Sequence, residues 1–107
     1  MTNHTIKVSD FTRYPGPRYE RLGPASGEKF RETVLLPALK THGANLRINM
    51  DGVIAYGSSF LEEAFGGAIR AGANQNDLLA VIEHLICQDE ESLKEEIEGY
   101  VRDQLEP

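Results

Sequence analysis

The stretch Tyr56-Gly-Ser-Ser-Phe-Leu-Glu-Glu-Ala-Phe-Gly-Gly, residues 56–67, has the most specific pattern in the chain. Ser59 followed by Glu62 has the spacing of a capping box, in which a serine caps a helix and a glutamate three residues later bonds back to it. Apolar residues then recur at helical spacing, at Leu61, Ala64, Phe65, Ala68 and Ile69. We therefore predict a helix that opens at Ser58-Ser59 and stops at Gly72.

Two short strands and one helix are predicted before this stretch. Residues 5–8 and residues 46–50 alternate in character, which predicts strands, and Asp51-Gly52 is a turn signal. Between the strands, Ser26 is expected to cap a helix with an apolar face at Phe30, Val34, Leu35, Ala38 and Leu39. Pro37 lies inside that pattern, so the helix is expected to kink or change there, and Gly43 is expected to end it.

The chain after Gly72 is less clear. Residues 77–88 fit both a helix and a strand, and we expect a brief helical turn from Asp77 followed by a strand over roughly 82–88. Asp89 is then expected to cap a last helix. The apolar positions of that helix are Leu93, Ile97, Tyr100, Val101 and Leu105. Strands that alternate with helices predict a small α/β layer structure.

Length and charge limit the range of functions. The 107 residues fit one domain, which we place at residues 1–107, and the net charge is −6. Residues 1–50 carry 8 Lys and Arg against 4 Asp and Glu, whereas residues 51–107 carry 3 against 13. Binding of bulk nucleic acid is not expected, because phosphate neutralisation needs a dominant basic surface. A local anion site in the first half is compatible with the charge.

Several cofactor and location classes are also not expected. The longest apolar run is far shorter than the roughly 20 residues that span a bilayer, so we expect no membrane segment. Residues 1–10 are polar and lack a signal core, and Cys87 is the only cysteine, which together point to the cytoplasm. His4, His42 and His84 lack metal-ligand spacing, so neither a metal nor another cofactor is predicted.

Residues 11–25 form a segment rich in Tyr, Pro, Gly and Arg. Its three prolines and two glycines predict an irregular loop or a loose hairpin rather than a long regular element. The candidate functional side chains of the loop are Arg13, Tyr14, Arg18, Tyr19 and Arg21. Arginine offers a planar fork of donors for anions and tyrosine can stack on a base. The loop is either a solvated connection or a recognition site for a phosphate, a nucleotide or an acidic partner.

Residues 56–67 closely resemble the STAS-like domain family of unknown function, a small prokaryotic and phage family. Three other segments match it too: Arg13-Tyr-Pro-Gly-Pro-Arg-Tyr, Ser26-Gly-Glu-Lys-Phe-Arg and Ile86-Cys-Gln-Asp-Glu-Glu-Ser-Leu. The resemblance covers residues 5 to about 102. It implies a small STAS-like α/β layer structure, with a short, mostly parallel or mixed sheet packed by about three helices.

The family name compares these proteins with STAS domains, the anti-sigma-factor-antagonist modules. In those modules a strand ends in an Asp-Ser-Ser-Gly-like turn that opens a helix, and a partner kinase phosphorylates a serine there. Ser58 and Ser59 occupy the serine positions, whereas Gly57 stands in place of the acidic residue and Phe60 in place of the glycine. The resemblance therefore marks Ser58 and Ser59 as a candidate phosphosite or anion contact, with helix capping as the other role.

We predict a non-enzymatic regulatory or protein-interaction module in prokaryotic signalling, because no catalytic base, nucleophile and orienting group can be identified. A kinase-like regulator is a candidate partner. The alternative is a small-anion or nucleotide-binding protein, in which the Arg/Tyr loop closes over a ligand at the Ser58 helix N-terminus. Gly66-Gly67 inside a helix predicts close packing or a partner contact, since each glycine costs about 1 kcal/mol relative to alanine. A homodimer is also expected to be feasible for so small a domain.

Overall fold

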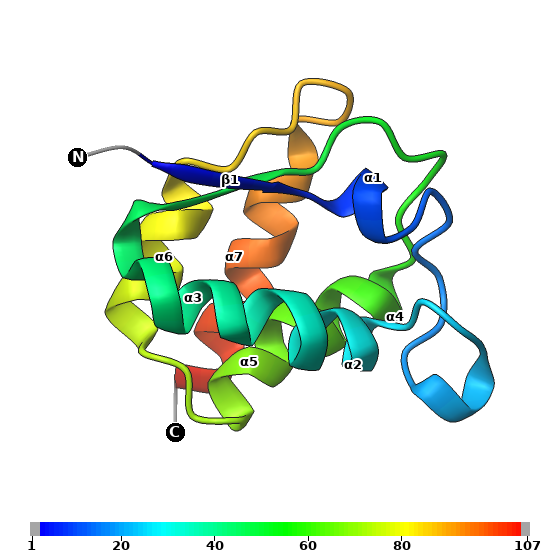
Figure 1. The fold of residues 1–107 in the computed structure, drawn as a ribbon, viewed down its shortest axis with the longest axis horizontal. Coiled ribbons are helices and arrows are strands. Elements are labelled where there is room, and N and C mark those ends of the chain that lie inside the picture. The colour runs from blue at the N-terminus through cyan, green and yellow to red at the C-terminus, as the bar shows by residue number, and fades with distance from the viewer. Residues whose placement is uncertain (1–2, 106–107) are drawn as a thin grey trace.

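A two-stranded parallel sheet lies along one side of the protein in the computed structural model, which describes residues 3–105 (Figure 1). The strands β1 (His4–Lys7) and β2 (Leu46–Asn49) pair in register from His4 opposite Leu46 to Lys7 opposite Asn49. Ile86 adds a single parallel bridge to Asn49 on the other side of β2. The long helix that lies between the two strands in the chain forms the crossover that parallel pairing requires.

The crossover helix contains a π-helical turn that ends shortly before Pro37. It consists of α2 (Gly27–Phe30), the π-helical turn η2 (Arg31–Leu35) and α3 (Leu36–His42). The Ser26 hydroxyl accepts a hydrogen bond from the Lys29 N–H at 3.0 Å, so the predicted cap is confirmed. The wide turn lies directly before Pro37, which lacks an N–H and crowds the carbonyl four residues back. Gly43, with a φ of 54°, ends the helix as predicted.

The second long helix also contains a π turn. It comprises α4 (Ser58–Leu61), η4 (Glu62–Gly66) and α5 (Gly67–Arg70), followed by a turn at Gly72. The helix itself is confirmed, but the predicted capping box of Ser59 and Glu62 is wrong. Gly57 holds the cap position and no side chain caps the helix. The Glu62 carboxylate is bonded instead to Arg18 from an earlier segment and to Arg70 at the end of the same helix.

The prediction for residues 77–88 is wrong, because the helix α6 runs over Gln75–Glu83 and only Ile86 pairs with the sheet. The Asn74 side chain caps this helix by accepting from the Asp77 N–H at 3.0 Å. Leu78, Val81 and Ile82 recur at helical spacing and are buried together, which favours helix over strand.

The last helix, α7 (Ser92–Leu105), buries Leu93, Ile97 and Val101 as predicted. The predicted cap at Asp89 is wrong, because this residue is bonded to the turn that follows β2. The Asp89 carboxylate accepts from the Gly52 N–H at 3.1 Å, and the Asp89 N–H donates to Asp51 at 2.9 Å. Asp89 therefore joins two loops and leaves the helix to begin at Ser92.

Three one-turn elements complete the described chain: α1 (Val8–Phe11), η1 (Glu20–Leu22) and η3 (Gly43–Asn45). The predicted strand over residues 5–8 lies one residue too late, because Val8 already belongs to α1. Residues 3–105 thus form an α/β fold with five helices, α1 included, rather than about three, and two of the five are widened by a π turn. The predicted single domain of residues 1–107 stays a prediction, and its ends lie outside the described residues.

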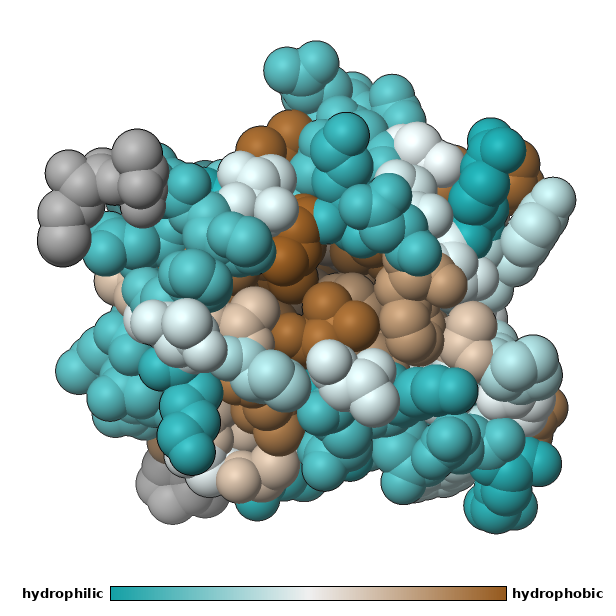
Figure 2. All heavy atoms as spheres, in the orientation of Figure 1, coloured by the Kyte–Doolittle hydropathy of each residue, from teal (hydrophilic) through white to brown (hydrophobic). Residues whose placement is uncertain are grey.

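The core lies between the sheet and the long helices. Phe30, Phe60 and Phe65 are fully buried, with ring centroids 5.8 Å apart for Phe30 and Phe60 and 6.4 Å apart for Phe30 and Phe65. A shallow groove partly lined by Ile6 and Val34 runs between β1 and η2, and Figure 2 shows apolar surface in the middle of this face. None of the described helices is long and apolar enough to cross a membrane.

Gly27 tests the packing between α2 and α4. A Cβ at this position would collide with the Phe60 carbonyl oxygen, which is backbone and cannot move aside alone. We expect Gly27→Ala to lower the free energy of unfolding by about 1–3 kcal/mol in urea titrations. Gly99→Ala is the control, because a Cβ there meets nothing within 4 Å, and it should raise stability by roughly 0.5–1 kcal/mol. Equal stabilities of the two variants would contradict this packing.

Candidate functional site

The loop of residues 11–25 lies against the segment that leads into α4 (Figure 1). The Pro15 carbonyl accepts from the Gly57 N–H at 2.8 Å, and the Arg13 carbonyl accepts from the Ile54 N–H at 2.9 Å. Two segments about 40 residues apart are thus joined through their backbones. The anion-binding alternative requires the loop to lie near the Ser58 turn, and it does. The two segments are joined there by direct hydrogen bonds between their backbones.

The same loop is fastened to the start of α2. The Pro17 carbonyl accepts from the Gly27 N–H at 2.9 Å, and the Arg18 carbonyl accepts from the Glu28 N–H at 3.0 Å. These are N–H groups of a helix's first turn, which have no partner within the helix. The Glu28 carboxylate returns a bond to the Glu20 N–H at 2.9 Å. The loop is irregular, as predicted, and hydrogen bonds hold it both to the segment before α4 and to the start of α2.

A cluster of arginines and glutamates fixes the loop further. Arg18 donates to Glu62 and lies 3.3 Å from Glu63, and Arg70 donates to Glu62 at 2.7 Å from the far end of the helix. The hydrogen bond with Glu62 raises the pKa of Arg18. The hydrogen bond from Arg70, with a second from Arg18, holds the pKa of Glu62 below its usual range. The charge of Arg18 is therefore paired with carboxylates of the same molecule.

The innermost pair of this cluster joins the two π turns. Arg31 in η2 donates to the Glu63 carboxylate in η4 and also to the Glu63 carbonyl at 3.0 Å. Only 12% of the Arg31 side chain and 10% of the Glu63 side chain are exposed, so this pair is largely shielded from water. Sequence reasoning missed Arg31, Glu63 and Arg70. Arg31 and Glu63 are 32 residues apart in the chain, and no local sequence pattern predicts their contact.

Gly66 and Gly67 are buried beside this cluster. A Cβ at Gly67 would collide with the Arg31 guanidinium, and one at Gly66 would lie 2.6 Å from the Glu62 carboxylate and 3.4 Å from the Tyr100 carbonyl. The glycines therefore leave room for the ion pairs. This geometry gives the packing role a physical reason and places the pair away from solvent.

The other predicted site residues face outward. Arg13, Tyr14, Arg21, Ser58 and Ser59 are exposed. Tyr19 is half-buried, and the Arg21 guanidinium lies over its ring, 5.3 Å from the centroid, which is a cation–π distance. The phosphosite prediction for Ser58 and Ser59 stays a prediction.

Exposed apolar side chains lie on the loop and on the segment bonded to it. The exposed large hydrophobic residues in the described chain are Tyr14 at 72%, Leu22 at 60% and Ile54 at 63%. Tyr14 and Leu22 lie on the loop, and Ile54 lies on the segment hydrogen-bonded to it. We call Arg13, Tyr14, Arg21, Leu22 and Ile54 the loop surface.

Two side chains that could act as nucleophiles, Cys87 and Tyr56, have raised pKa values. Partial burial raises the pKa of the Cys87 thiol, which disfavours the nucleophilic thiolate. Burial also raises the pKa of Tyr56, whose hydroxyl donates to the Met50 carbonyl at 2.6 Å. Within residues 3–105, no group of three His, Cys, Asp or Glu side chains is placed to hold a metal ion.

Comparison with known proteins gives one match. A family model described as a STAS-like domain of unknown function matches residues 26–90. The matched segment runs from the Ser26 cap through both π turns, β2 and α6, and it leaves most of the loop surface outside. A search of curated proteins and a search of solved structures each found no match.

The Arg31–Glu63 pair yields a stability test. Removing one partner leaves the other charge largely buried with weaker partners only, Arg18 and Arg70 for Glu63 and the exposed Glu32 for Arg31. We therefore expect Arg31→Met and Glu63→Gln each to cost about 3 kcal/mol. The double variant should cost less than the sum of the two, because the residues act as a unit. The matched control is Arg102→Met, whose pair with Glu98 is exposed and should cost less than about 1 kcal/mol. Urea titrations that give Arg31→Met and Arg102→Met equal losses would contradict the assignment.

The lowered pKa of Glu62 predicts a pH dependence. Because the folded protein holds the proton less tightly than the unfolded chain, Glu62 stabilises the fold above its ordinary pKa of 4.5, and this contribution is lost as the pH falls further. The stability difference between the wild type and Glu62→Gln should therefore be largest near neutral pH and shrink in acid. Thermal unfolding across this range measures it. Glu83→Gln, an exposed residue outside the cluster, should show a small difference at every pH.

Proposed function

The chain belongs to the STAS-like domain family of unknown function, and from that premise we propose that it is a non-enzymatic regulatory or protein-interaction module. Its contact site is the loop surface. One observation carries the proposal: each exposed large hydrophobic residue of the described chain lies either on the loop of residues 11–25 or on the segment hydrogen-bonded to it. Arg13 and Arg21 directly precede two of them, Tyr14 and Leu22, and tyrosine and arginine are residue types that often dominate binding energy at protein interfaces.

The loop surface is ordered before a partner arrives. The backbone of the loop is hydrogen-bonded to Ile54 and Gly57 on one side and to Gly27 and Glu28 on the other. The Arg18 side chain also forms an ion pair with Glu62. A surface that is already ordered loses less conformational entropy on binding. This arrangement favours a docking site over a flexible lid.

The charge of the loop surface indicates the kind of partner. Arg13 and Arg21 are exposed and form no ion pair within residues 3–105. We therefore propose a protein partner that offers acidic groups around an apolar patch, because opposite charges at an interface rim steer association.

A regulatory form of the proposal involves Ser58 and Ser59. Both are exposed, and they directly follow Gly57, whose N–H is bonded to the Pro15 carbonyl in the loop. A phosphate of about −2 charge placed here by a kinase-like partner would stand next to the loop surface and change its electrostatics. Such a switch would suit a prokaryotic, cytoplasmic signalling protein, which is the setting that we propose.

Two features favour this function over binding of a small anion or a nucleotide. Arg18, the loop arginine nearest to the Glu62 carboxylate, is already paired. The Gly57 N–H at the opening of α4 is already bonded to Pro15. A small anion would have to displace these partners, whereas a protein surface can use the exposed side chains as they stand.

Capture of partners from a lysate of the native host tests the proposal. We expect the double variant Arg13→Ala/Tyr14→Ala to lose at least about tenfold in recovery of a specific partner, because loss of one hot-spot residue costs this much or more. The control is Glu83→Ala/His84→Ala, an exposed pair at the end of α6, which should capture the partner like the wild type. Equal unfolding temperatures would show that all baits are folded.

The same experiment can overturn the proposal. If no captured protein depends on Arg13 and Tyr14, the loop surface is not the docking site. A thermal shift with nucleotides or phosphate that Arg13→Ala abolishes would favour the anion-binding function instead. The intact mass of the bait after incubation with lysate and ATP reports any phosphate added at Ser58 or Ser59.

A further inference from the structure

Gly99 lies on the solvent face of α7, where the fold of the monomer does not require a glycine. A Cβ at Gly99 would meet nothing within 4 Å, and its backbone dihedral angles are not of the left-handed kind. Glycine weakens a helix interior relative to alanine. Nothing inside the described protein therefore requires the small residue, whereas close approach of a second backbone from outside would require it.

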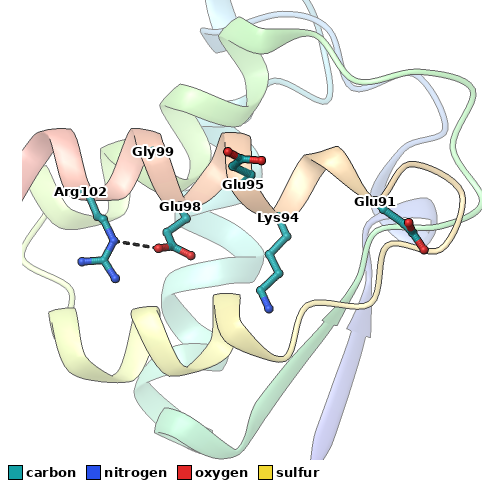
Figure 3. Close-up of a pocket in the computed structure, with 6 residues that line it drawn as sticks. All are labelled: Glu91, Lys94, Glu95, Glu98, Gly99 and Arg102. Atoms are coloured by element: carbon teal, nitrogen blue, oxygen red, sulfur yellow. Dashed lines mark hydrogen bonds and ion pairs between the residues drawn. The ribbon is translucent and has the colours of Figure 1, made fainter.

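Opposite charges stand on either side of Gly99 along this face (Figure 3). Glu95 precedes it by four residues and Arg102 follows it by three, so both lie on the same face of the helix. The Arg102 Nε donates to Glu98 at 2.8 Å, and its two terminal nitrogens make no hydrogen bond within residues 3–105. Glu95 likewise forms no ion pair in the described part of the chain.

These groups border a shallow hollow over the helix. Its lining residues are Glu91, Lys94, Glu95, Glu98, Gly99 and Arg102. The hollow contains no large apolar side chain, and its rim carries both signs of charge. A helix that carries charges of both signs matches this lining, because each charge can then face an opposite one.

We propose that a second copy of this chain docks its own α7 antiparallel across Gly99 and forms a two-fold symmetric dimer. An antiparallel crossing centred between residues 98 and 99 places Glu95 opposite Arg102 of the partner subunit. The symmetry repeats the contact, so two intermolecular ion pairs form together. A parallel crossing would instead place each of these residues against its own like charge.

The dimer should be weak and sensitive to salt. A helix of 14 residues is only about 21 Å long, so the contact is smaller than a standard protein interface. Its ion pairs are exposed and screened by salt. Association is therefore expected at high micromolar concentration and low ionic strength, and it should fade as salt is added.

Charge exchange tests this contact in sedimentation experiments on the full chain. Glu95→Arg places two arginines together and Arg102→Glu places two glutamates together, so each variant alone should weaken dimerisation at least about tenfold. An equimolar mixture of the two variants should form a heterodimer, because both crossing pairs are then opposite in sign. Lys40→Glu, an exposed charge reversal on α3, should dimerise like the wild type.

Gly99→Gln provides an independent arm. Its side chain would fill the crossing point and abolish the dimer, while the monomer should unfold at the same temperature or higher. A wild type that stays monomeric at millimolar concentration and low salt would overturn the proposal. So would a dimer that survives both single charge reversals, or a mixture of the two variants that stays monomeric.

Discussion

The buried pair of Arg31 and Glu63 is the constraint on which the rest of the structure depends. Each charge is largely removed from water, which is costly unless the partner group supplies matching hydrogen bonds. Arg31 meets this condition by donating to both the carboxylate and the backbone carbonyl of Glu63. The pair links the two π turns and requires Gly67 to lack a side chain. Arg18 from the loop and Arg70 from the end of the helix that carries Glu63 then complete the cluster.

This cluster also explains how a chain with a basic first half and an acidic second half folds upon itself. Arg18 and Arg31 come from the basic half, and Glu62 and Glu63 from the acidic half. Part of the charge asymmetry seen along the sequence is therefore neutralised inside the fold. Two charged surfaces remain outside: arginines with apolar neighbours on the loop surface, and charges of both signs along α7. We propose different partners for the two surfaces, an unlike protein for the first and a second copy of the chain for the other.

Membership of the STAS-like family describes the framework more than the activity, since one fold can serve many functions. The matched residues 26–90 include both π turns and the Glu62–Glu63 pair, whereas Arg18 and most of the loop surface lie before them. π turns in helices occur frequently at functional sites. Here they bring Arg31 and Glu63 together, and the cluster in turn fixes a loop whose outer side chains are free to bind.

The sequence by itself determined the features that depend on near neighbours. The Ser26 cap, the end of a helix at Gly43 and the apolar face of α7 follow from short spacings, because helix geometry brings such residues together wherever the segment lies. Only the tertiary structure decided the features in which a local pattern competes with a distant partner. Glu62 forms ion pairs with Arg18 and Arg70 rather than a capping box, and Asp89 bonds to Gly52 rather than to its own helix. A charged side chain takes the strongest partner that the folded chain offers, and spacing along the sequence does not reveal that partner.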